Sequence, residues 1–332
     1  MNRHIGAAAL ASALLCTAFN AQATENGQSH ADLGYIDTLA GLPLAPGFYL
    51  RDDVNFQVSG RLNNGSGNQL SINLGPKTKL GTQFRNTVEA DILAAVYVPD
   101  WKVPYINATI GTAAYEFYAN SNAKLTSAIG IPQARGSSNA GFGDITIVPI
   151  FIGFDVPGTD FHFVFSPLEF TAPIGRYSKN QPIGNNPGLN YFSYRPALEM
   201  TYLNKTGQEF SLNMSTSINT QNQATHYKSG EEFYFTYVFQ QYFSPQFAVG
   251  IGGYYYKQVG NDTRKGNLVA STIASDVLGS GPGNKGETFA IGPVISYNYS
   301  HDIVAQAHWD HEVFAYNRAQ RDQVYARVAF KF

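Results

Sequence analysis

The stretch HWDHEV, residues 308–313, holds the densest group of side chains that could do metal or acid–base chemistry. Imidazoles and carboxylates are ligands that several metals accept. On a β-strand, alternation would place His308, Asp310 and Glu312 on one side of the strand. His308 and Glu312 would then stand about 13 Å apart, too far to share one metal ion. We therefore expect no metal site on this strand alone, and no cofactor.

A second set of reactive side chains recurs at alternate positions along other segments, where charges on one face would line a lumen. The candidates are Arg51, Asp53, Arg61, Arg85, Glu89, Asp91, Arg195, Glu199, Glu209, Glu232, Arg327 and Lys331, together with His308, Asp310 and Glu312. Rings of mixed charge set the field and selectivity of a pore. The same charges could instead pair across the lumen and brace it, and both interpretations stay open.

Nucleophilic catalysis would need a serine, a histidine and a carboxylate within reach of one another. The chain has His162, His226, His301 and His308, but no nucleophile in a recognisable setting. The glycine-rich stretch GSSNAGFG, residues 136–143, is not followed by the helix that phosphate binding requires. We expect that the protein is not an enzyme.

The elements that must carry these side chains are strands, because apolar and polar residues alternate along the chain. In 209–219, for example, Phe210, Leu212 and Met214 alternate with Glu209, Ser211 and Asn213. A period of two predicts strands, and these segments match the roughly 9–11 residues of a tilted membrane-spanning strand. We predict twelve strands, at 48–61, 82–98, 104–119, 142–155, 160–173, 191–203, 208–219, 231–242, 246–258, 286–300, 303–315 and 321–332.

The predicted connections alternate in length, which indicates how the strands are arranged. Short ones (PDWKV, PGTD, NKTG, FSP and HD) alternate with long ones at 62–81, 120–141, 174–190, 220–230 and 259–285, and only 316–320 breaks the pattern. Short periplasmic turns and long extracellular loops are typical of bacterial outer-membrane barrels. The predicted fold is therefore an all-β, transmembrane antiparallel β-barrel of twelve strands, spanning residues 48–332.

The N-terminus is typical of a secreted protein. Residues 5–19 form an apolar run, and AQA at Ala21 to Ala23 supplies the small residues of a cleavage site. We predict a signal peptide over residues 1–23, which contains the only cysteine, Cys16. Residues 24–47 would then precede the barrel, either as a periplasmic tether or as a segment folded into the lumen.

Composition limits the partners. The chain has 22 Lys and Arg against 24 Asp and Glu, so no basic surface is expected and nucleic acid is excluded as a partner. Only 14% of residues are charged, below the roughly 25% of soluble domains.

The last ten residues, QVYARVAFKF, keep strict alternation up to the final residue. Such an ending resembles the signal that the barrel-assembly machinery reads, and Val328, Phe330 and Phe332 would carry it. The last strand is expected to pair with the first.

Several stretches together resemble the outer-membrane family named for the meta-pathway of phenol degradation. They are ENGQSHADLG (25–34), GLPLAPGFY (41–49), GFGDITIVPIFIGF (141–154), APIGRY (172–177), YKSGEEFYFTY (227–237), AVGIGGYYYKQVGND (248–262) and AIGPVISYNY (290–299). Family members usually carry Pro-Thr-Gly where this chain has API before Gly175. The resemblance implies a barrel that helps hydrophobic or aromatic compounds to cross the outer membrane, with no catalytic residues.

We therefore expect a passive channel for small hydrophobic or aromatic solutes in a Gram-negative outer membrane, with lipid and the barrel-assembly machinery as further partners. Three alternatives remain open: a structural barrel with a plugged lumen, an enzyme that modifies outer-membrane lipids, and a soluble exported β-sandwich. The sequence does not give the substrate or the oligomeric state.

Overall fold

The computed structural model describes residues 24–332, except 36–37, 70, 76–77, 82–84, 102–107, 123–137, 181–185, 270–283 and 301. The predicted signal peptide lies outside these residues. Within them, no helix is long and apolar enough to span a membrane.

In the described residues, regular structure consists of strands, which follow one short 3-10 helix, η1 (Glu25–Gly27). The strands are β1 (Gly47–Leu62), β2 (Ser71–Gly75), β3 (Thr78–Gly81), β4 (Asn86–Val98), β5 (Ala108–Asn122), β6 (Ser138–Phe142), β7 (Ile145–Asp155), β8 (Phe161–Ser166), β9 (Phe170–Ala172), β10 (Ser193–Tyr194), β11 (Ala197–Leu203), β12 (Gln208–Asn219), β13 (Tyr227–Lys228), β14 (Glu232–Tyr242), β15 (Phe247–Gln258), β16 (Thr263–Arg264), β17 (Asn267–Leu268), β18 (Glu287–Asn298), β19 (Ile303–Tyr316) and β20 (Ala319–Lys331).

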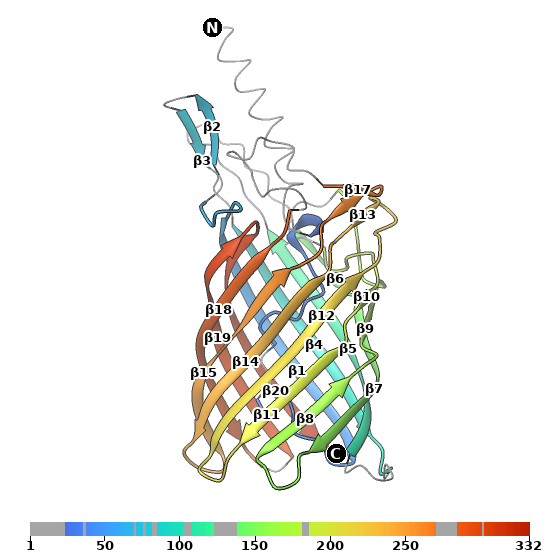
Figure 1. The fold of residues 1–332 in the computed structure, drawn as a ribbon, viewed down its shortest axis with the longest axis vertical. Helices are drawn as coiled ribbons and strands as arrows, with labels where there is room; N and C mark the ends of the chain where they lie inside the picture. Colours follow the sequence, from blue (N-terminus) through green and yellow to red (C-terminus); the bar gives the residue numbers. More distant parts are fainter. Residues whose placement is uncertain are drawn as a thin grey trace.

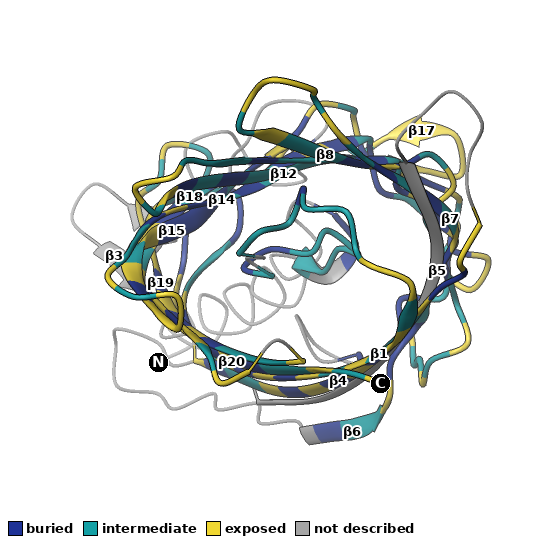
Figure 2. Cartoon of the chain, turned by 90° about the horizontal axis from the view of Figure 1, so that it is seen from below, coloured by how far each residue is buried: buried dark blue, intermediate teal, exposed yellow. Residues whose placement is uncertain are grey.

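The long strands form one antiparallel sheet that closes on itself (Figures 1 and 2). Strand β1 pairs with β4 on one side and with β20 on the other, from Tyr49 opposite Lys331 to Leu62 opposite Ala319. Closure pairs the backbone groups that a sheet edge would leave open. As expected, the last strand pairs with the first: the Phe332 amide donates to the Phe48 carbonyl at 2.8 Å.

Three predicted strands differ from the observed ones. The predicted strand 142–155 corresponds to β7, which starts only at Ile145, and β6 lies before it, almost entirely within the predicted connection 120–141. The predicted strand 160–173 is split into β8 and β9 by a turn that begins at Pro167. The predicted strand 191–203 breaks between β10 and β11 at Pro196, since proline has no amide proton for the ladder. The long connections 62–81, 220–230 and 259–285 also contain short strands. Strand β2 pairs with β3, and β16 with β17, within one connection, whereas β13 pairs with β16 across two connections.

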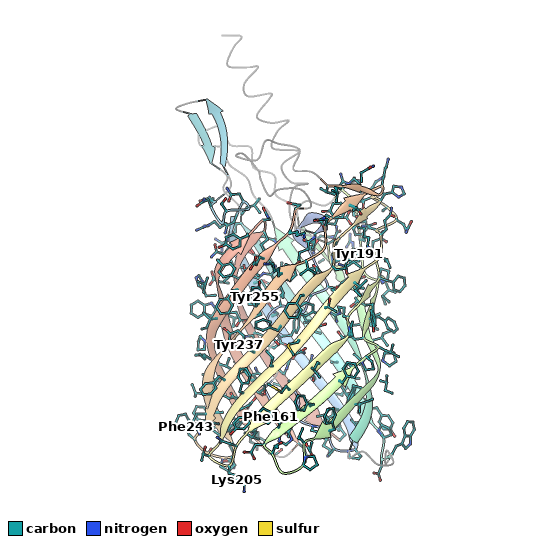
Figure 3. The ribbon with its side chains drawn as sticks, viewed as in Figure 1. Phe161, Tyr191, Lys205, Tyr237, Phe243 and Tyr255 are labelled. Atoms are coloured by element: carbon teal, nitrogen blue, oxygen red, sulfur yellow. The ribbon has the colours of Figure 1, made fainter. Side chains whose placement is uncertain are left out.

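The two ends of the ring differ. We call the end that carries β13, β16 and β17 the loop end, and the end where β1 begins and Phe332 lies the turn end (Figure 1). Exposed aromatic side chains near the turn end include Phe161, Phe243, Phe247 and Phe332. Figure 3 labels Phe161 and Phe243 in this region. Phe161 packs on Tyr202 with ring centroids 5.1 Å apart. Aromatic girdles of this kind mark the interfaces of membrane barrels.

The outer face of the ring is apolar. Its exposed large side chains include Phe48, Leu50, Val54, Phe56, Leu93, Tyr97, Phe165, Phe239, Val249, Ile251, Ile295, Trp309, Val313, Val324 and Phe330. A band of this extent on a water-exposed protein would drive aggregation. In a barrel, such an outer band is the surface that meets hydrocarbon.

Strand β4 contradicts the prediction for two lumen candidates. Asp91 lies opposite Val54 and Glu89 opposite Phe56, and residues paired across antiparallel strands share a face. Glu89 and Asp91 therefore lie on the outer face, and both are exposed. The prediction was wrong because it assumed that the apolar face of every strand points outward. In β4 the apolar face points inward instead, and Val98 packs there against Val148, Phe151 and Val164.

Residues 24–35 and 38–46, which we call the N-terminal segment, lie inside the ring and cross it from the loop end to the turn end (Figures 1 and 2). At the loop end, the Thr24 amide donates to Asp262 at 3.1 Å. Near the turn end, the Leu39 amide donates to Glu209 at 2.6 Å and the Gly41 amide to the Thr201 hydroxyl at 2.9 Å. The segment is thus bonded to the inner wall along its length.

Gly41 allows the closest approach of the N-terminal segment to the wall. A Cβ at this position would lie 2.4 Å from the Thr201 amide nitrogen and 2.6 Å from the His162 carbonyl oxygen. We expect Gly41→Ala to destabilise the barrel by about 1–3 kcal/mol, the usual effect of overpacking. The measurement is the temperature at which the folded band on a gel converts to the unfolded one. Gly60→Ala is the matched control, because its Cβ would meet nothing within 4 Å. Equal conversion temperatures for the two variants would contradict the close contact.

Candidate functional site

The inner wall of the ring is polar and almost completely buried. Its side chains that are at most 1% exposed include Asp53, Arg195, Glu209, Glu232, Gln240, Gln258, Asp310, Glu312 and Gln323. Buried polar groups are stable only when they are hydrogen-bonded or ion-paired. Many of these groups are paired, and the contacts described below form three clusters and a row of hydrogen bonds.

The first cluster joins β1 to β20 around one carboxylate. Asp53 lies 2.6 Å from the Nε of Arg327 and 2.9 Å from the Nε of Arg51. The Arg327 guanidinium also donates to the Tyr325 hydroxyl at 2.6 Å, and Tyr35 of the N-terminal segment packs edge-on against the Tyr325 ring. Two guanidinium groups on one carboxylate leave a net positive charge under the N-terminal segment.

The second cluster binds the N-terminal segment by charge. Arg195, just after β10, pairs with Asp32 at 2.8 Å and with Glu169 at 2.5 Å, and it donates to the His30 carbonyl. Glu199 lies on the same wall, where it accepts a hydrogen bond from Asn213 at 3.1 Å. Arg195 is the cation that ties the middle of the segment to the ring.

The third cluster contains the HWDHEV stretch. His308, Asp310 and Glu312 are all buried, whereas Trp309 and His311 are exposed, which agrees with strand alternation. His308 lies 3.2 Å from Asp310, which accepts from Gln323 at 2.8 Å. Glu312 accepts from Tyr254 at 2.8 Å, and Arg321 and Arg318 lie 3.3 and 3.7 Å from it. The His308–Asp310 contact lies within β19, and the other contacts join β19 to β15, to β20 and to the turn between β19 and β20. Within the described part of the chain, no group of three His, Cys, Asp or Glu side chains is placed to hold a metal ion.

A row of three residues resembles the catalytic set of a hydrolase. His30 lies 2.6 Å from the Ser193 hydroxyl through Nδ1 and 2.9 Å from Asp144 through Nε2. Ser193, however, donates its proton to Asn219 at 2.7 Å and is fully buried. Asp144 also accepts the amides of Gly175 and Leu189. The row therefore holds His30 in place and does not present a nucleophile. Sequence reasoning missed it because the three residues lie far apart in the chain.

The structure brings most predicted lumen residues to the inner wall. Arg51, Asp53, Arg195, Glu199, His308, Asp310, Glu312 and Arg327 lie there, Glu89 and Asp91 lie outside, and Arg85 precedes β4 with an exposed side chain. The inner residues do not form one site. They are distributed over separate clusters, each of which contacts or lies near the N-terminal segment.

The loop end carries a further buried acid, Glu25 of the N-terminal segment. Its carboxylate accepts from Asn222 at 2.7 Å, and its amide donates to Ser229 at 3.2 Å. Burial raises the pKa of Glu25, and hydrogen bonds from Thr225 and Asn222 oppose the rise. The first residues of the segment are thus held by loop residues.

Residues 33–328 match a family described as "Putative MetA-pathway of phenol degradation". The chain belongs to this family. The match begins in the N-terminal segment and extends into β20, and it confirms the resemblance seen in the sequence motifs. No curated protein matches the chain in sequence.

Solved structures show which fold this family member shares. The COG4313 outer membrane channel from Pseudomonas putida F1 aligns with a TM-score of 0.67 at 14% identity, over 90% of this chain and 100% of that one. The transport unit of the autotransporter AIDA-I from Escherichia coli aligns with a TM-score of 0.47 at 9% identity, over 87% and 90%. A TodX monoaromatic hydrocarbon channel mutant aligns at 0.44 and 8%, over 87% and 90%. The first likeness shows a shared barrel fold, and the other two are too distant to inform the function.

Arg195 offers a test of the charge cluster. Arg195→Met would leave Glu169 buried without its cation, so we expect a loss of about 3–5 kcal/mol in the free energy of unfolding. Lys257→Met is the matched control, since Lys257 pairs with Glu287 at 3.2 Å but is 49% exposed. An exposed pair contributes about 1 kcal/mol or less. Denaturation followed by tryptophan fluorescence gives both values, and similar losses would refute the role of Arg195 as the central cation.

Proposed function

We propose that this protein is a twelve-stranded barrel in a Gram-negative outer membrane, through which small hydrophobic or aromatic solutes diffuse passively. Over the described residues, twelve strands are counted when β6 and β7, β8 and β9, and β10 and β11 are each taken as one interrupted strand of the barrel. Connections at the turn end, such as 156–160 and 204–207, are short, whereas 259–286 at the loop end is long. This asymmetry supports a periplasmic turn end and an extracellular loop end.

The observation that carries the solute class is the inward face of β4. Ala90, Ile92 and Ala94 point into the lumen and are at most 3% exposed. Neighbouring β1 instead presents Arg51, Asp53 and other polar groups inward. An apolar strip in a polar lumen suits an aromatic ring better than an ion, because ligand sites combine apolar walls with a few polar groups.

A solute can pass only if part of the lumen wall or its contents moves, because the N-terminal segment occupies the lumen. Its bonds to Asp262, Arg195 and Glu209 keep it against the wall in this conformation. A solute would pass when the segment or the side chains beside it shift, as lids and loops do in other proteins. The same bonds favour a second candidate function, a structural barrel that stays plugged and transports nothing.

We also propose that Val328, Phe330 and Phe332 form the signal read by the barrel-assembly machinery. Their positions support this, because Val328 and Phe330 lie on the outer side of β20 and Phe332, directly after β20, is 72% exposed. Side chains on this outer side would be accessible to an assembly machinery that acts within the membrane.

The solute class is tested on β4. We expect Ile92→Gln to lower the uptake of an apolar aromatic solute such as toluene by about fourfold, the effect of removing roughly one apolar group from the path. Uptake is measured in cells that lack the wild-type gene and carry each variant at equal membrane abundance. Ile92→Leu is the control, because it keeps the apolar surface. Unchanged uptake in the Gln variant, with wild-type uptake well above that of empty cells, would remove the hydrophobic strip from the path.

The two candidate functions separate in a planar bilayer. We expect a variant that lacks residues 24–40 but keeps the first 23 to conduct ions in larger steps than the wild type, because the segment no longer fills the lumen. Folding of both proteins is checked by heat-modifiable mobility. If both folded proteins stay silent, the channel is excluded and the structural barrel remains.

A further inference from the structure

The loop end contains a buried carboxylate, that of Asp262, which lies in the connection after β15. It is fully buried, and it accepts hydrogen bonds from the Tyr227 hydroxyl at 2.6 Å and from Gln258 at 2.5 Å. It also accepts from the backbone amides of Gly230 at 2.9 Å and Thr24 at 3.1 Å. Four hydrogen-bond donors therefore converge on the Asp262 carboxylate, as donors do where a protein binds an anion.

The site lacks a positive charge. The four donors are neutral, and in the part of the chain that the structure describes no Lys or Arg side chain forms an ion pair with Asp262. The nearby charged residues are Glu25, itself acidic, and Arg264, whose guanidinium stacks on the Tyr227 ring at 5.3 Å. Burial raises the pKa of Asp262 to about 7, although hydrogen bonds from Tyr227, Gly230, Gln258 and Thr24 oppose the rise. A buried carboxylate of this kind is stabilised by a cation.

Thr24 has a backbone conformation that L-residues rarely adopt. Its φ is 62° and its ψ is 166°, in a region that is essentially reserved for glycine. The angle φ exists only while residue 23 is attached, because it is defined by the preceding carbonyl carbon. Hydrolysis of the bond between residues 23 and 24 would therefore remove the strain and leave the Thr24 nitrogen where it is. That bond directly follows AQA, the predicted cleavage site.

We propose that the α-ammonium of Thr24, released by hydrolysis of the Ala23–Thr24 bond, is the cationic partner of Asp262. Water supplies a hydroxyl to the Ala23 carbonyl and a proton to the Thr24 nitrogen, and a further proton from solvent completes the ammonium. The nitrogen that now donates one hydrogen bond to Asp262 then carries a full charge at the same place. Charge-assisted bonds of this kind are about twice as strong as neutral ones.

This ion pair anchors the N-terminal segment at its free end. The other end continues into β1 at Gly47, at the opposite end of the ring. After processing, the segment is therefore held at both ends and does not act as a free tail. The inference does not depend on whether the barrel conducts, so its test is separate from the transport experiments.

The test uses periodate, which cleaves the Cα–Cβ bond of an N-terminal threonine only when its α-amine is free and accessible. In the folded wild-type protein in detergent, we expect Thr24 to be protected, since its nitrogen is held against the buried carboxylate of Asp262. After unfolding it should react, as shown by intact mass. Asp262→Asn should make the folded protein react roughly tenfold faster or more, because the bond to a charged group is lost. Glu231→Gln is the matched control, a nearby loop acid that is 43% exposed and pairs with Lys228.

A second variant keeps Asp262 intact. One extra threonine placed between Ala23 and Thr24 moves the ammonium by about 3.8 Å, the span of one residue, so its new N-terminus should react in the folded protein. Rapid reaction of the folded wild type would overturn the proposal. So would protection of Asp262→Asn equal to that of the wild type, or no reaction of the unfolded wild type.

Discussion

The structure depends on one constraint, which is that a closed ring of strands has an inside as well as an outside. Pairing of β1 with β20 closes the sheet and gives the backbone groups of both strands hydrogen-bond partners, which the hydrocarbon core of a membrane requires. Closure of the sheet also brings the inward side chains of all the barrel strands together around a narrow lumen. Most of these side chains are charged or polar and almost fully buried, so they require hydrogen-bond or ion-pair partners within that space, whereas the inward side chains of β4 are apolar. The pairing in the lumen follows from the closure of the sheet.

Strand-to-strand pairs meet only part of this requirement, and the N-terminal segment supplies further partners. Asp32 provides the second acid for Arg195, and the His30 ring bridges Ser193 and Asp144. Backbone amides at Leu39 and Gly41 meet acceptors on β12 and β11. The segment therefore acts as an inner layer of the fold, with the same physical role that a hydrophobic core has in a soluble domain.

The sequence predicts the ring well and its contents poorly, for a physical reason. Alternation is a property of one strand, so β12 was predicted at its observed bounds, 208–219. Which face turns inward depends on the neighbours. In β4 the apolar face turns inward because Val98 meets Val148 and Phe151, which are distant in sequence. The row of His30, Asp144 and Ser193 was invisible for the same reason, since its members meet only after the barrel has closed.

The distribution of bonds along the N-terminal segment limits how a lumen of this kind can open. Gly41 lies against the backbone of β11 and β8 without room for a Cβ, so the turn end of the segment is fixed by sterics. Its middle is held by Arg195 through an ion pair whose acid, Asp32, is 47% exposed on its side chain. An ion pair with one solvated partner is weaker than a buried one. In the proposed channel, this half-exposed contact at Asp32 is therefore the one that we expect a solute to displace first, while both ends of the segment stay attached to the wall.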